Sequence, residues 1–214
     1  MSKNNPILQV KDLTVSFNAF AGKVQAVRGV SFDLNKGETL CIVGESGSGK
    51  SVTNKAIMGI LSKNAVIDRG EILYDGMDLT KLTEEQFCQI RGKRIAMVFQ
   101  DPLSALNPIM KVGKQITETL CVHQKLSHEQ AKKRALELMA AVGIPEPEKR
   151  FNQYPFQFSG GMRQRIVIVI ALACNPEILI CDEPTTALDV TIQSKILDLI
   201  KEIKQERNLS VIFI

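Results

Sequence analysis

Hydrophobic and polar positions alternate along the start of the chain. Leu8, Val10, Leu13, Val15 and Phe17 are apolar and are separated by polar residues, which is typical of strands that bury one face. Residues 24–34 continue the trend, and residues 39–43 form a short, mostly apolar segment typical of a buried strand. The first part of the chain is therefore predicted to be β-structure.

Beyond residue 50 the pattern changes to helices that alternate with short strands. A helix is predicted from Lys50 to about residue 61, and two helices that break near Lys125 are predicted within residues 111–142. Thr83 and Ser127 are each followed three residues later by glutamine, the capping-box spacing of a helix start. A later helix is predicted with Asp189 as a possible cap, and further strands are predicted at 72–74, 95–99, 178–181 and 210–214. Strands that alternate with helices indicate an α/β fold.

One segment fits two structures. Residues 166–170 read Ile-Val-Ile-Val-Ile, and β-branched residues favour a strand. The glycines before this segment and the alanines after it also allow a buried helix.

Composition narrows the class of protein. The chain has 214 residues, of which 44% are hydrophobic and 23% charged, so it is neither disordered nor fibrous. Aromatic residues are scarce and the net charge is only +4, which argues against nucleic acid as a partner. The longest apolar run, 166–174, is shorter than the roughly 18 residues that a membrane span needs. No signal peptide is recognisable, so a soluble, cytosolic chain is expected.

The cysteines also indicate a cytosolic protein. There are five of them, an odd number, and no two form a C-x-x-C pair. We expect reduced, buried thiols and no zinc site.

A glycine-rich segment carries the strongest chemical signal. It matches the pattern G-x-x-x-x-G-K-[ST] and consists of Gly44, Glu45, Ser46, Gly47, Ser48, Gly49, Lys50 and Ser51. Only a backbone with little side-chain bulk can wrap a polyphosphate with its N–H groups, and the helix that follows adds its positive end. Lys50 supplies a charge for the β- and γ-phosphates, and the Ser51 hydroxyl is placed to hold Mg²⁺.

Two carboxylates follow the apolar strand at 178–181. Asp182 is expected to face the Mg²⁺ ion, and Glu183 is free to polarise a water molecule. The alternative is a strand-to-turn junction whose acids merely face solvent. The glycine-rich segment at residues 44–51, called the phosphate loop below, favours the catalytic interpretation.

A second glycine pair precedes a candidate helix. Ser159, Gly160 and Gly161 could offer their N–H groups to an anion at the start of that helix. Taken alone this signal is weak, because serine followed by glycine is a common helix cap.

The motifs together resemble a family. The strings GESGSGKS, VFQDP, FSGGMRQR and ILICDEPTTALD occur in the order found in the nucleotide-binding subunits of ABC transporters. QDPLSALNP and YPFQFSGGMRQR further resemble the importer subfamily for oligopeptides, dipeptides and nickel. This resemblance implies an α/β P-loop NTPase core (1–100 and 175–214) that includes an N-terminal antiparallel β subdomain, and a helical subdomain with the signature helix (about 101–174). It also implies a helix, not a strand, at 166–174.

The resemblance assigns roles to single residues. Residues 44–51 match the Walker A loop, and Gln100 matches the glutamine that contacts Mg²⁺ and the attacking water. Asp182 matches the Walker B aspartate and Glu183 the catalytic glutamate. The remaining matches are to the signature that touches the ATP of the opposite subunit (Ser159, Gly160 and Gly161), to the loop that crosses the dimer interface (Asp189), and to the aromatic residue that stacks on adenine (Phe17, with Phe20 as its rival).

The family's function follows as an expectation. Such a subunit binds Mg-ATP, closes head-to-tail on a second ATPase subunit, either identical or a paralogue, and opens again after hydrolysis. It lies at the cytoplasmic face of the membrane, and a groove in its helical subdomain receives a short helix of the permease. The extracytoplasmic solute-binding protein would be an indirect partner.

The chain departs from the family pattern in two places. Phe156 stands where the subfamily often has histidine, and the sequence ends at Ile214, before the switch histidine. We therefore expect a chain truncated at its C-terminus. The alternative function is a module that binds ATP without efficient turnover. An ABC ATPase acting on DNA or ribosomes is disfavoured, because the chain has neither a coiled-coil insertion nor tandem cassettes.

Overall fold

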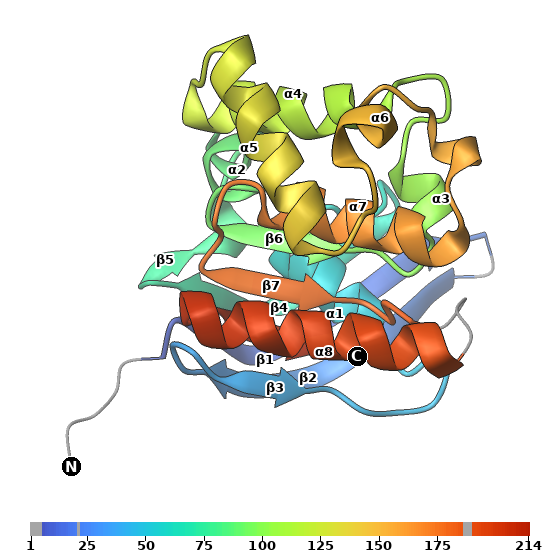
Figure 1. Cartoon of the computed structure of the whole chain (residues 1–214). Helices are drawn as coiled ribbons and strands as arrows, with labels where there is room; N and C mark the ends of the chain where they lie inside the picture. Colours follow the sequence, from blue (N-terminus) through green and yellow to red (C-terminus); the bar gives the residue numbers. More distant parts are fainter. Residues whose placement is uncertain (1–5, 21, 186–189) are drawn as a thin grey trace. The chain divides into compact units, whose positions relative to one another are not determined.

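The structure is a computed structural model that describes residues 6–20, 22–185 and 190–214. The chain folds into two compact units. Figure 1 labels the helices and strands that form them. The first unit contains Met1–Arg91 and Ser210–Ile214, and the second contains Gly92–Leu209. Strands and helices alternate as the sequence predicts, which confirms the α/β class. The subdomain boundaries that the resemblance implies stay a prediction.

An antiparallel sheet dominates the first unit. Its strand order is β2-β1-β4-β5, and its strands are β1 (Leu8–Ala19), β2 (Gly22–Leu34), β4 (Ala65–Tyr74) and β5 (Met77–Asp78). The apolar residues that predicted β1 are buried from Leu8 to Val15. The three-residue step from Val10 to Leu13 coincides with a register shift, where Asp12 has φ of +47°. Such a bulge lets both residues bury their side chains on one face.

The first unit also carries the short strand that precedes the phosphate loop. Strand β3 (Thr39–Cys41) pairs in parallel with β8 (Ser210–Phe213), and the loop leads into α1 (Lys50–Ile57). The helix ends earlier than predicted because Gly59 adopts φ of +62° and the N–H of Ile60 donates to Lys55 O. This arrangement is a common way to end a helix.

The remaining elements of the first unit are η1 (Leu79–Lys81) and α2 (Glu84–Ile90). The predicted capping box at the start of α2 is confirmed. Thr83 Oγ1 accepts from the N–H of Gln86, and Gln86 Oε1 accepts from the N–H of Thr83.

The second unit joins a parallel strand pair to a group of helices (Figure 1). Strands β6 (Ile95–Val98) and β7 (Ile178–Cys181) are buried along their whole length. The helices are α3 (Pro102–Ala105), α4 (Val112–Gln124), α5 (His128–Ala141), α6 (Pro147–Phe151), η2 (Pro155–Gln157), α7 (Gly160–Leu172) and α8 (Val190–Arg207). Helix α4 contacts α5, α6 and α7. The break between α4 and α5 lies at Lys125, which has φ of +54°, as the sequence predicts.

The ambiguous segment at 166–170 is helical, as the resemblance implies. It lies in α7, so the strand that β-branched residues favour is wrong. Residues 166–169 are all buried, which means that this part of the helix is surrounded by protein. Tertiary packing then outweighs the modest helix propensity of valine and isoleucine.

The predicted burial of the cysteines holds only in part. Cys174 and Cys181 are buried, but Cys41 and Cys88 are exposed, and all five thiols are free. Cys41 is exposed because the short strand β3 carries its side chain on an uncovered face, a property that an apolar sequence run does not reveal. Within the described residues, none of the helices combines the length and the apolar character needed to cross a membrane.

Candidate functional site

The phosphate loop lies between the end of β3 and the start of α1, the context that the motif requires. Residues 44–48 are exposed, whereas Gly49 is buried and has φ of +92°. A Cβ atom at Gly49 would lie 2.5 Å from the carbonyl oxygen of Ala26. Glycine is therefore needed here both for the backbone conformation and for the close approach to β2.

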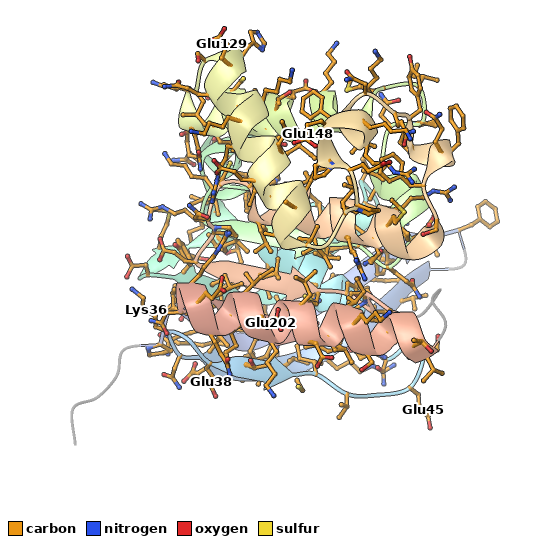
Figure 2. The ribbon with its side chains drawn as sticks, viewed as in Figure 1. Lys36, Glu38, Glu45, Glu129, Glu148 and Glu202 are labelled. Carbon is orange, nitrogen blue, oxygen red and sulfur yellow. The ribbon has the colours of Figure 1, made fainter. Side chains whose placement is uncertain are left out.

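Lys50 folds back over its own loop. Its Nζ donates to Gly44 O at 2.7 Å and to Glu45 O at 2.8 Å. The side chain of Glu45 projects outward from the loop (Figure 2), so its negative charge is directed away from the loop backbone. The ammonium group thus lies against the loop, where it can meet the oxygens of a phosphate.

Two aromatic residues compete for the predicted adenine contact, and both belong to the first unit. Phe17 lies in β1, opposite Val24 and Ala65, and is half-buried. Phe20 follows the end of β1 and is fully exposed. The choice of Phe17 stays a prediction.

In the second unit, two predicted catalytic residues contact each other. Gln100 Nε2 donates to Glu183 Oε2 at 2.7 Å. Val98 and Cys181 are register partners at the ends of the parallel strands β6 and β7, and each functional residue follows its strand end by two positions. Parallel strands end at the same edge of a sheet, which explains why residues 83 positions apart in sequence meet here.

Asp182 and Cys181 lie beside this pair along the chain. Asp182 is buried, and its N–H donates to Val98 O at 3.0 Å, so its backbone is fixed by the neighbouring strand. Burial raises the pKa of the Cys181 thiol to about 12. This thiol is therefore protonated at neutral pH and is no nucleophile.

The glycine pair at 160–161 opens helix α7. Ser159 is the N-cap, and its Oγ accepts from the N–H of Met162. The sequence motif did not assign a role to Arg163, whose Nε donates to Pro155 O at 2.8 Å. This hydrogen bond holds the segment that precedes the glycine turn. Asp189, the predicted residue of the dimer interface, lies outside the described residues.

The donor atoms suit magnesium better than zinc. In the described part of the chain, no three His, Cys, Asp or Glu side chains gather as a metal site. Mg²⁺ typically takes one or two carboxylates, water and substrate phosphates, so it needs no such cluster. Because Gln100 donates through Nε2 to Glu183, its amide oxygen is the atom left to face a cation. Ser51, Gln100 and Asp182, the predicted ligands, each carry a side-chain oxygen, the donor atom that this ion prefers.

A glycine-rich loop at a helix start and a glutamine–glutamate pair at the strand ends define a P-loop nucleotide-binding protein. The chain belongs to the ABC transporter family, whose model matches residues 27–186. Among solved structures it resembles a dimeric post-hydrolysis state of the ATP-binding cassette MJ0796 bound to ADP and Pi. The TM-score is 0.85 with 30% identity, over 96% of this chain and 86% of that one.

Two similar curated proteins carry names that refer to peptide transport. The chain is 61% identical to the oligopeptide transport ATP-binding protein OppD of Bacillus subtilis (strain 168), over 97% of this chain and 58% of the relative. It is 58% identical to the dipeptide transport ATP-binding protein DppD of Lactococcus lactis subsp. cremoris (strain MG1363), over 97% of this chain and 60% of the relative. The chain thus spans about three-fifths of the length of these relatives.

Proposed function

We propose that this chain binds and hydrolyses ATP to power the import of oligopeptides or dipeptides. The hydrogen bond between Gln100 and Glu183 carries the proposal, because it joins the two residues that would orient the attacking water. The similarity to ATP-binding transport proteins of oligopeptides and dipeptides supports the substrate class. It also favours this function over a module that binds ATP without turnover.

Each residue has a defined task in the proposal. The N–H groups of residues 44–51 hold the phosphates, and Lys50 exchanges the carbonyl oxygens of Gly44 and Glu45 for phosphate oxygens. Glu183 accepts a proton from the attacking water or orients it, and Gln100 fixes that carboxylate. Mg²⁺, held by Ser51, Gln100 and Asp182, would neutralise the charge that develops on the phosphates. Phe17 would stack on the adenine.

The proposal includes a second ATPase subunit, identical or a paralogue. Ser159, Gly160 and Gly161 present the start of helix α7, and this end of a helix favours an anion. In the proposal they close on the ATP that the companion subunit holds, and Asp189 contributes to the interface. The dimeric form of the similar cassette MJ0796 supports this arrangement.

The permease is the other proposed partner. Ile109 and Phe156 are strongly exposed apolar side chains of the second unit. The N–H of Val112 donates to Gln153 O, which joins the chain segments that carry them. Exposed apolar residues of this kind suit an apolar helix of a membrane subunit. The chain would then sit peripherally at the cytoplasmic face of the membrane, with the solute-binding protein as an indirect partner and no nucleic acid.

A phosphate-release assay on the purified chain tests the proposal. We expect ATP to be converted to ADP and phosphate in the presence of Mg²⁺, and we expect EDTA to abolish this reaction because the metal neutralises the phosphate charge. Hydrolysis at the same rate with EDTA would contradict the metal's role. Failure to bind ATP at millimolar concentration would contradict the proposed function itself.

A further inference from the structure

Helix α1 is held at the end opposite the phosphate loop. Arg91 Nε donates to Met58 O at 2.8 Å, and one of its terminal nitrogens donates to Gly59 O at 2.9 Å. These carbonyls close the helix that begins with Lys50. A guanidinium group at the C-terminal end of a helix satisfies its last carbonyls and complements its dipole.

The Arg91 side chain is itself fixed on several sides. Both terminal nitrogens pair with the carboxylate of Glu84, one of them at 3.0 Å, and this hydrogen bonding lowers the pKa of Glu84. The guanidinium carbon lies 4.6 Å from the centre of the Phe87 ring. Arg91 therefore loses little further freedom when it binds the two carbonyls.

The Phe87 ring in turn packs on the end of α1. A Cβ atom at Gly59 would lie 2.4 Å from two atoms of that ring, so the ring occupies the space that a side chain would need. Phe87 is buried. We call these five residues the Arg91 clamp: Met58, Gly59, Glu84, Phe87 and Arg91.

We propose that Arg91 is a positioning residue for the phosphate loop. Helix α1 has eight residues, or about 12 Å of length. A rigid element this short transmits a displacement from one end to the other, so the clamp fixes where Lys50 and Ser51 stand. The inference rests on the proposed function, because it assumes that the loop binds ATP.

No recognised motif includes Arg91. It lies 33 residues from Met58 in sequence, and its role depends on contacts with α1, not on contact with the nucleotide. A weaker hold on α1 lets the loop sample positions in which its N–H groups no longer converge on the phosphates.

The test measures the dissociation constant of Mg-ATP for the folded chain with Arg91→Ala. Loss of two hydrogen bonds to the end of α1 should weaken binding by about three- to tenfold. Arg91→Lys should weaken binding by only about twofold. Its ammonium group keeps the positive charge and can still donate hydrogen bonds, but it lacks the planar fork that reaches both carbonyls. Arg69→Ala is the matched control, since Arg69 is an exposed arginine of the same unit that pairs with Asp12 on the sheet; its dissociation constant should equal that of the wild type.

The outcomes separate positioning from simple stabilisation. A purely structural role would lower the melting temperature and the active fraction but leave the dissociation constant of the folded protein unchanged, which would overturn the inference. Should Arg91→Ala fail to fold, wild-type affinity in Arg91→Lys would overturn it as well. A wild-type chain that does not bind Mg-ATP would instead overturn the proposed function, and the inference with it.

Discussion

Glu183→Gln is expected to bind ATP normally but to hydrolyse it at least about a hundredfold more slowly. The carboxylate of Glu183 accepts a hydrogen bond from Gln100, and glutamine keeps its size while losing its capacity to accept a proton. The loss should therefore appear in turnover and not in the affinity for nucleotide.

Single-turnover hydrolysis with saturating Mg-ATP measures this effect. Glu177→Gln is the matched control, because Glu177 precedes the same strand, β7, and pairs with Arg94 in a partly exposed ion pair. Such pairs contribute little, so this control should stay within about twofold of the wild-type rate. Unchanged turnover in Glu183→Gln would remove Glu183 from the catalytic role.

Lys50→Ala is expected to lower the affinity for ATP by roughly ten- to a hundredfold. A loss of this size is expected when one hydrogen bond to a charged group is removed. The Lys50 ammonium lies against the carbonyls of Gly44 and Glu45. Its removal leaves the backbone N–H groups of the loop as the main remaining contribution from this segment to phosphate binding.

A nucleotide titration of the variant measures the loss. Lys55→Ala is the control, because Lys55 is an exposed lysine in the last turn of the same helix. This substitution removes the same charge at a greater distance from the loop. We expect nearly wild-type affinity for it. An equal loss in both variants would indicate a general charge effect, and no loss in Lys50→Ala would contradict the assignment of the loop.

Local signals in the sequence predicted much of the fold. The capping boxes at Thr83 and Ser127 mark the starts of α2 and α5, because both partners of each box lie within four residues. The phosphate loop was recognisable for the same reason, since its chemistry lies in one continuous stretch of backbone. For residues 166–170, local propensity predicted a strand, whereas the packing around them makes them helical.

Contacts between distant segments could not be predicted from the sequence. The resemblance assigned roles to Gln100 and Glu183 separately, whereas their hydrogen bond depends on the pairing of β6 with β7. No sequence pattern predicted the role of Arg91, because its partners Met58 and Gly59 lie 33 and 32 residues away at the end of helix α1. Even the orientation of Lys50 toward Gly44 and Glu45 follows from the loop's three-dimensional path.

The proposed function requires residues 44–51 to hold a triphosphate that Lys50 contacts. A crystal structure of the chain with Mg²⁺ and a non-hydrolysable ATP analogue tests it most directly. We predict that Lys50 Nζ leaves the carbonyl oxygens of Gly44 and Glu45 and contacts the β- and γ-phosphates. An analogue bound elsewhere, with Lys50 still on those two carbonyl oxygens, would contradict the account.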